Sequence, residues 1–148
     1  MSMFSAFNVN ASGLTAQRYR MDIISENVAN ASTTRTEDGT PYRRKVVTFA
    51  EKGRQTTFSR VLGNVSAGYS GQGVKVDKVS EDTWTEMKMV YDPSHPDADE
   101  NGYVTYPNVN IVSEMTNLID ASRAYEANST AFSASKSMAL KGLELVNQ

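Results

Sequence analysis

Residues Ile111 to Val146 read IVSEMTNLIDASRAYEANSTAFSASKSMALKGLELV and are the most regular segment of the chain. One set of positions recurs along it at alternating intervals of four and three residues. The set is Ile111, Met115, Leu118, Ser122, Tyr125, Ser129, Phe132, Lys136, Ala139, Leu143 and Val146. This heptad spacing predicts one long helix that packs along its length against another helix.

The predicted helix is longer than the core that this chain can build. At the usual rise per residue it would run for about 54 Å, whereas a compact globule of this chain length is roughly 30 Å across. A core helix in an ordinary α+β domain is the simpler alternative, but such helices average only about 11–12 residues. We therefore expect the helix to need partners beyond its own core.

A weaker stripe of the same kind lies at the N-terminus. Its members are Phe4, Phe7, Ala11, Leu14, Arg18, Met21, Ser25 and Val28. Arg18 and Ser25 interrupt it, and Gly13 lowers helix propensity by about 1 kcal/mol. Polar residues that favour local side-chain bonds follow Asn30, so the helix should end there. The simplest architecture pairs the two terminal helices.

The central region has the character of short strands and loops. Residues 42–50 predict a strand, and two alternating runs, at residues 73–79 and 84–91, predict a β-hairpin in which Trp84 packs. The segment between them, residues 51–72, predicts a mobile loop with a short element at residues 58–62. A third strand or a helix must support the hairpin, because isolated hairpins are marginal in water.

A connector with three prolines leads into the C-terminal helix. Residues 92–110 predict irregular structure, with Asn110 as the helix N-cap and Glu114 near the positive end of the helix dipole. The predicted fold class is α+β, with long N- and C-terminal helices paired as a coiled coil. Residues 1–34 and 109–148 would form the helical domain, and residues 35–108 a β-hairpin-rich lobe with connector loops.

Composition excludes several classes of protein. The chain has 148 residues, 39% hydrophobic residues and a net charge of −2, which favours neither disorder nor nucleic-acid binding. No apolar run approaches the ~20 residues of a membrane span. The first residues carry no basic and apolar leader, so we expect no cleaved signal peptide. With no cysteine there is no disulfide and no thiolate metal site.

Charge divides unevenly along the chain. Residues 1–60 carry nine basic and five acidic side chains, whereas residues 61–148 carry six basic and twelve acidic ones. Complementary patches of this kind can set the register of head-to-tail stacking. Single surface charges are more simply solvated.

An acidic loop is the sharpest alternative to a structural role. Asp97, Asp99, Asn101 and Gly102 match the first positions of a calcium-binding EF-hand loop. Its twelfth position should be a bidentate glutamate, but Asn108 stands there. A small calcium-dependent binding protein that uses residues 97–108 is therefore the runner-up interpretation, and a simple turn is the plainer one.

The only histidine, His95, offers a third interpretation. With acidic neighbours it could ligate a metal or act as a base, but catalysis also needs a nucleophile, an orienting group and a pocket. The pattern supplies none of these. A histidine held in a proline-bounded turn is the simpler reading, so we expect no enzyme activity, cofactor or metal.

Several segments together resemble the axial proteins of the bacterial flagellum, which build its rod and hook. The N-terminal signature of that family is matched by residues 11–17 (ASGLTAQ) and 27–33 (NVANAST). The resemblance narrows to the proximal rod of the basal body through TTRT at 33–36, PYRR at 41–44, YDPSHPDADENGYV at 91–104, YPNVN at 106–110, ASRAYEAN at 121–128 and SKSM at 135–138. Glu26 departs from the family, in which many members have asparagine.

The resemblance implies a structural subunit that leaves the cell through the flagellar type III export apparatus. Its partners would be other proximal and distal rod proteins and the basal-body protein at the rod base, in a periplasm-spanning helical tube. The termini would be frayed in the monomer and ordered on assembly. The assembly interface would comprise Phe4, Phe7, Leu14, Met21, Asn27, Val28, Asn30, Ile111, Met115, Leu118, Ser122, Tyr125, Ser129, Phe132, Lys136, Leu143 and Val146.

Overall fold

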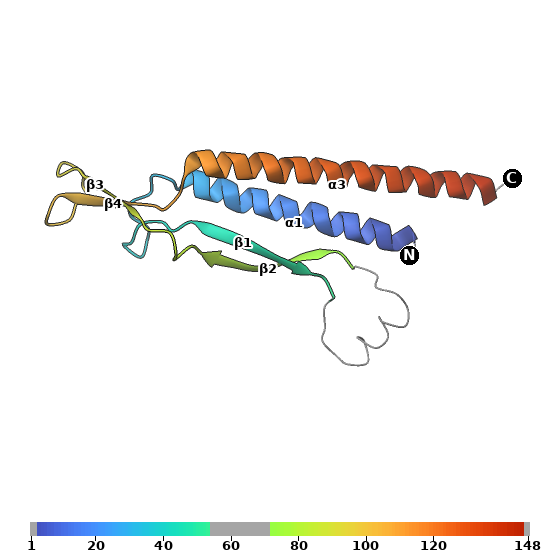
Figure 1. Cartoon of the computed structure of the whole chain (residues 1–148), viewed down its shortest axis with the longest axis horizontal. Helices are drawn as coiled ribbons and strands as arrows, with labels where there is room; N and C mark the ends of the chain where they lie inside the picture. Colours follow the sequence, from blue (N-terminus) through green and yellow to red (C-terminus); the bar gives the residue numbers. More distant parts are fainter. Residues whose placement is uncertain (1–2, 54–71, 147–148) are drawn as a thin grey trace. The chain divides into compact units, whose positions relative to one another are not determined.

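The computed structural model describes residues 3–53 and 72–146, and the side chains of Phe4 and Val146 lie outside this description. Along the described chain, one long helix precedes four short strands and a second long helix follows them (Figure 1). The elements are α1 (Met3–Ala29), β1 (Lys45–Glu51), β2 (Val74–Glu81), β3 (Lys88–Tyr91), β4 (Tyr103–Tyr106) and α3 (Ile111–Val146). The predicted α+β class and both terminal helices are confirmed. No described helix is both long and apolar enough to cross a membrane.

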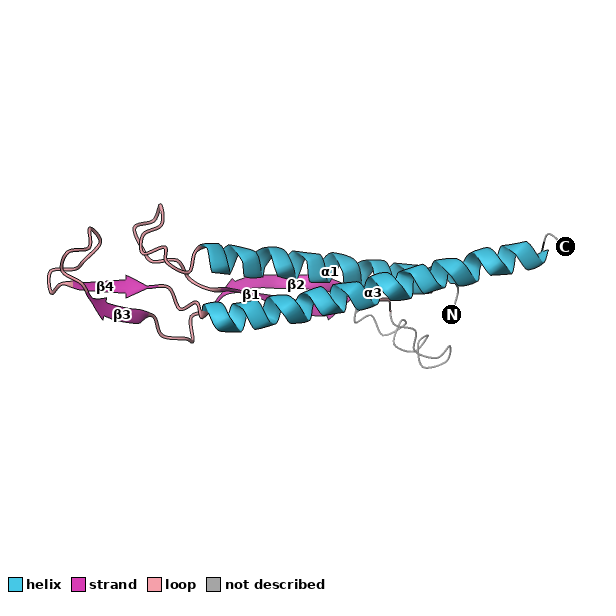
Figure 2. Ribbon diagram, turned by 90° about the horizontal axis from the view of Figure 1, so that it is seen from above, coloured by secondary structure: helices cyan, strands magenta, loops and turns pink. Residues whose placement is uncertain are grey.

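The chain forms two compact units, and each contains a part of both helices. Unit 1 comprises Met1–Tyr19, Phe49–Asp77 and Ser122–Gln148, and unit 2 comprises Arg20–Thr48 and Lys78–Ala121. In each unit the α1 and α3 segments lie side by side (Figures 1 and 2). The predicted division into a helical domain and a central lobe follows other boundaries and stays a prediction.

The ends of the helices follow the local chemistry of the sequence. The Asn110 side-chain oxygen accepts hydrogen bonds from the backbone N–H groups of Val112 and Ser113, which makes Asn110 the N-cap of α3 as predicted. At the end of α1 the Asn30 amide donates to the Glu26 carbonyl, and its oxygen accepts from the Thr33 hydroxyl. These bonds compete with the next helical turn, so α1 ends at Ala29.

The first sheet pairs β1 with β2. Backbone hydrogen bonds continue the pairing just past both ends of the strands. The Lys52 N–H donates to the Gly73 carbonyl, and the Asp82 N–H donates to the Arg44 carbonyl. The predicted hairpin of residues 73–79 with 84–91 is therefore wrong, because the first of these runs pairs with β1. An alternating pattern shows that a strand has two different faces, but it does not show which strand lies beside it.

The second sheet pairs β3 with β4 in antiparallel register, with Val90 opposite Val104. Residues 103–106 thus form a strand within a segment that was predicted to be irregular. The turn before β4 contains Gly102 at a φ of 80°, a conformation that glycine adopts at little cost. Val104 is buried and supplies a small apolar core for this sheet.

In unit 1 the two helices approach closely. The rings of Phe7 and Phe132 meet edge to face at 5.1 Å between centroids. A Cβ atom on Gly13 would lie 2.7 Å from the Asn128 side-chain oxygen, so glycine allows the close approach at this point. The Ser12 hydroxyl accepts a bond from the backbone N–H of Val74 and ties β2 to α1. Of the loop predicted at residues 51–72, residues 54–71, with the short element at 58–62, lie outside the described residues. Glu51 is the last residue of β1.

Candidate assembly surface

The buried stripe of α3 is offset from the heptad that the sequence suggests. Glu114, Ala121 and Ser135 are buried and Asn128 is half-buried, whereas Met115, Ser129 and Lys136 are exposed. Leu118, Phe132 and Ala139 belong to both sets and are half-buried. The stripe therefore keeps the four-and-three spacing but uses smaller or polar residues at every seventh position, which lets the helices approach closely.

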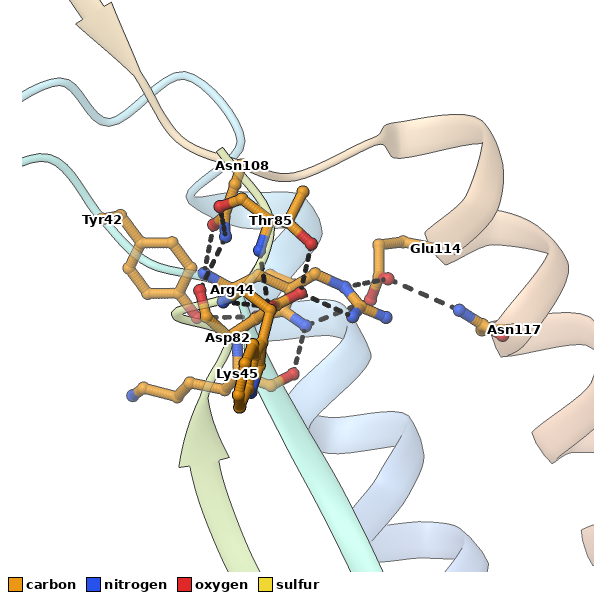
Figure 3. A network of polar contacts seen from close by, with 10 residues as sticks. Tyr42, Arg44, Lys45, Asp82, Thr85, Asn108, Glu114 and Asn117 are labelled. Atoms are coloured by element: carbon orange, nitrogen blue, oxygen red, sulfur yellow. Dashed lines mark hydrogen bonds and ion pairs between the residues drawn. The ribbon is translucent and has the colours of Figure 1, made fainter. Parts of the chain in front are cut away.

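A buried carboxylate lies at the centre of unit 2 (Figure 3). Glu114, 1% exposed, accepts a bond from Arg44 Nε at 2.9 Å and another from the Asn27 amide at 3.1 Å. Asn117 donates a longer bond to the same carboxylate. Glu114 thereby joins the start of α3 to the end of α1 and to the residue before β1.

Asn27, also 1% exposed, uses both ends of its amide. The amide nitrogen donates to the Lys45 carbonyl and to Glu114. The amide oxygen accepts from the Lys45 backbone N–H and from the Tyr42 hydroxyl. Every bond lies in unit 2, so Asn27 fixes where the chain leaves α1 and begins β1.

The burial of Tyr42 raises its pKa. Desolvation is the main cause, followed by the negative charges of Glu26 and Glu114, and together they raise the pKa of Tyr42 to about 12. Glu26 is in turn paired with Lys45. The phenol is therefore protonated, and a donor to Asn27, throughout the physiological pH range.

The turn at residues 82–85 is held to the same network. The Asp82 carboxylate accepts bonds from the backbone N–H groups of Trp84 and Thr85 and from the Thr85 hydroxyl. These hydrogen bonds hold the pKa of Asp82 below its usual range, and the bond from the Thr85 hydroxyl has the largest effect. Arg44 Nη1 lies 3.5 Å from the same carboxylate.

Asn108 completes the network from the connector. Its amide donates to the carbonyls of Asp82 and Thr85, and its oxygen accepts from the Arg44 backbone N–H. The network thus joins α1, β1, the 82–85 turn, the connector and α3 within unit 2. Buried ion pairs of this kind add little net stability, but removing one partner is costly, so they hold one arrangement against others.

A second face of α3 is apolar and uncovered. Ile111, Val112, Met115 and Ile119 are exposed, Val112 by 74% and Met115 by 55%. At about 100° per residue they lie within one arc of the helix, which the buried Glu114 does not share. Single exposed apolar residues are ordinary, but a contiguous stripe marks an interaction surface.

The residues predicted for the assembly interface divide between these environments. Those that are buried or half-buried within their own unit are Phe7, Leu14, Met21, Asn27, Val28, Asn30, Leu118, Ser122 and Phe132. Those that are exposed are Ile111, Met115, Tyr125, Ser129, Lys136 and Leu143. Their role in assembly stays a prediction, and only the exposed set is free to meet another chain without rearrangement.

The acidic loop uses its carboxylates within its own fold. Asp97 accepts from the Thr34 hydroxyl and pairs with Arg35, and Asp99 accepts from the backbone N–H groups of Asn101 and Tyr103. Asn108 is turned into the polar network of unit 2. Among the described residues, no group of three or more acidic, histidine or cysteine side chains could hold a metal ion.

His95 lies in the predicted proline-bounded turn. Its Nδ1 accepts a bond from the backbone N–H of Asp97, and its ring meets Tyr106 edge-on at 6.4 Å between centroids. Trp84 differs from its predicted packing role, because the side chain is 94% exposed. A hydrophobic side chain in an alternating run is expected to pack, but residues 82–85 form a hydrogen-bonded turn that directs Trp84 outward.

The polar network was not predicted. Glu114 was placed near the helix dipole, and Asn27 was predicted for the assembly interface. Both residues were therefore singled out, but for other roles. Nothing in the sequence pattern indicates that residues 70 or more positions apart would be in contact. Pairing of this kind depends on tertiary contacts, which periodicity does not contain.

Comparison with known proteins places both terminal segments of the chain in one class of protein. Residues 7–35 match the family model described as flagella basal body rod protein. Residues 100–145 match the one described as flagellar basal body rod FlgEFG protein C-terminal. These matches cover most of α1 and nearly all of α3, and they define the class as flagellar basal-body rod proteins.

Relatives of similar length narrow the class further. The chain is 46% identical to the flagellar basal-body rod protein FlgC of Bacillus subtilis, with 98% of this chain and 99% of the relative covered. The FlgC proteins of Borreliella burgdorferi, at 46% identity with 99% of both chains covered, and Salmonella typhimurium, at 40% with 98% of both covered, are also similar. The chain belongs to the FlgC family of flagellar basal-body rod proteins. It is a structural rod subunit of the basal body.

Proposed function

We propose that this rod subunit assembles with neighbouring rod proteins through α1 and α3 into an open helical tube. The tube would surround the flagellar export channel, transmit torque and span the periplasm. The proposed partners are the other proximal and distal rod proteins and the basal-body protein at the rod base. The role is purely structural, and the chain would reach the tube through the type III export apparatus without a cleaved signal peptide.

One observation carries the proposal. The first turns of α3 present Ile111, Val112, Met115 and Ile119 outward, while a neighbouring face of the helix holds the buried Glu114. A helix with one face buried in its own unit and a second apolar face uncovered favours contact with a second chain. A contact between unlike surfaces that does not close on itself generates a helical assembly. The polar network supports this role, because it holds the outward stripe in one position relative to the rest of unit 2.

The test replaces one exposed residue of the stripe. We expect Met115→Asp to abolish incorporation into tubes formed with the other rod proteins, as seen by electron microscopy, because a charge would be buried at the contact. Its helix content should not change, because the side chain is exposed in the free subunit.

The matched control is Thr40→Asp, which adds the same charge to an exposed turn of unit 2 away from α3. It should assemble normally. Normal incorporation of Met115→Asp would overturn the proposed role of the stripe.

A further inference from the structure

Trp84 is an exposed aromatic side chain on a rigid turn. It is 94% exposed, yet its backbone N–H is bonded to the Asp82 carboxylate. That carboxylate also contacts Arg44, and the Asn108 amide donates to the carbonyls at both ends of the turn. A side chain held in this way has little backbone freedom left to lose on binding, which is the usual condition for a strong anchor.

Trp84 does not stand alone on the surface of unit 2. The residues that follow it line a groove of about 450 Å³ together with the connector and the first turn of α3. Its lining includes Thr85, Glu86 and Lys88, then Pro107 and Val109 of the connector and Val112 of α3. The groove is continuous with the outward stripe, because Ile111 and Val112 belong to both.

The charge around this surface selects among occupants. Unit 2 carries thirteen acidic and seven basic side chains. Glu86 and Lys88 both line the groove, and Asp120 is exposed beside the stripe. The complementary partner is an apolar helix with basic flanks. Tryptophan and such charge pairing together give affinity and register.

The C-terminal half of α3 has this chemistry. Lys136, Leu140 and Leu143 are exposed at intervals of four and three residues. Lys141 is exposed between them and pairs with Glu144 at 3.3 Å. Residues 129–143 contain no acidic side chain. The same chain therefore carries an apolar seat in unit 2, which is acidic overall, and an apolar stripe with lysines in unit 1, which carries eight basic and four acidic side chains.

We propose that the surface formed by Trp84, its groove and the outward stripe is the seat for residues 136–143 of α3 from a second copy of this chain. The contact joins unlike surfaces, so it repeats from copy to copy rather than closing into a dimer. This inference rests on the proposed function, and it names the partner and the anchor residue.

The experiment mixes two full-length variants with complementary defects. One, with Leu140→Asp and Leu143→Asp, keeps the seat and Trp84. The other, with Trp84→Ala, lacks the anchor but keeps the apolar stripe with lysines, and it contributes no tryptophan emission because Trp84 is the only tryptophan. Each variant alone should stay monomeric at concentrations where the unmodified chain associates.

The mixture should form a one-to-one complex by sedimentation, and the Trp84 emission should move to shorter wavelength as the indole is covered. The affinity of the unmodified chain for itself should fall at least about tenfold with Trp84→Ala, the loss typical of an anchor residue. Thr83→Ala, an exposed neighbour on the same turn, is the matched control and should associate normally.

Two results would overturn the inference. One is association of the unmodified chain with no change in Trp84 emission, and the other is the absence of any self-association at high concentration. Neither result bears on the proposed function. That proposal is tested separately, by whether the Met115→Asp variant assembles with the other rod proteins. An equal loss of association with Thr83→Ala would also contradict an anchor role for Trp84.

Discussion

Unit 1 and unit 2 use the same two helices but hold them together differently. In unit 2 the buried side chains include Asn27, Asn108 and Glu114, which are joined by hydrogen bonds and an ion pair. In unit 1 the helices meet through the edge-to-face contact of Phe7 with Phe132 and through the close approach at Gly13. The polar contacts are directional and specify one arrangement, whereas the apolar contacts depend on area and tolerate small shifts.

The difference matches two requirements of the proposed assembly. Unit 2 carries the outward stripe and Trp84, and its polar network holds them in place within the free chain. Unit 1 has less buried polar structure among its described residues, so on this proposal its helices would adjust when neighbouring subunits pack against them. Substitutions at four positions would test this difference between the two units.

The largest effect is expected for Glu114→Ala. It leaves the Arg44 guanidinium and the Asn27 amide short of a buried partner, and we expect a loss of about 3 kcal/mol in the free energy of unfolding of unit 2. Urea denaturation followed by circular dichroism would measure it. Glu114→Gln keeps the shape and should cost less. A loss below about 1 kcal/mol for Glu114→Ala would contradict the central place of the network.

A smaller loss is expected in unit 1 for Phe132→Ala. Truncating a fully buried phenylalanine costs about 3–5 kcal/mol, but Phe132 is only half-buried, so we expect about 1–2 kcal/mol. Hydrogen exchange of the α1 and α3 amides in unit 1 should speed up, while that in unit 2 should not. Equal acceleration in both units would show that they do not open independently.

Tyr42 gives unit 2 a dependence on alkaline pH. Because its pKa is raised to about 12 in the folded chain, its contribution to stability is full below the ordinary tyrosine pKa near 10 and is lost as the pH rises toward 12. We expect the unmodified chain to lose roughly 1 kcal/mol more than Tyr42→Phe between about pH 9 and about pH 11. Parallel urea curves at the two pH values would measure the difference, and identical losses would argue against a buried Tyr42.

The smallest effect on stability is expected for Trp84→Ala. The side chain is almost fully exposed, so the free energy of unfolding should change by less than about 0.5 kcal/mol. Thermal unfolding would measure it. A large loss would mean that Trp84 packs within its own chain, which would remove the basis for its role as an anchor.

The sequence predicted the parts of this structure that depend on local pattern. The heptad from Ile111 to Val146 predicted α3 with its bounds, and Asn110 was recognised as its cap. Strand pairing was predicted wrongly, since β2 joins β1 and β3 joins a strand placed in the connector. Alternation is a property of one strand, whereas pairing depends on contacts between distant segments.

Only part of the candidate surface could be predicted, because the local pattern does not show which face of a helix meets another segment. The stripe repeat identified Ile111 and Met115, which are exposed, but it could not distinguish the face that meets α1 from the face that meets solvent. Both faces have apolar residues at helical spacing, and the structure uses Ala121 and Ser135 where the heptad suggested larger neighbours. Small residues carry little hydrophobic signal, although they permit the closest approach.

The most direct test of the central claim is the reactivity of a single thiol at position 115. Because the chain contains no cysteine, Met115→Cys would be its only reactive thiol. In the free subunit it should react quickly with a soluble reagent, and in tubes formed with the other rod proteins it should be strongly protected. Equal labelling rates in the free and assembled states would contradict the claim that the outward stripe of α3 is covered by a neighbouring subunit.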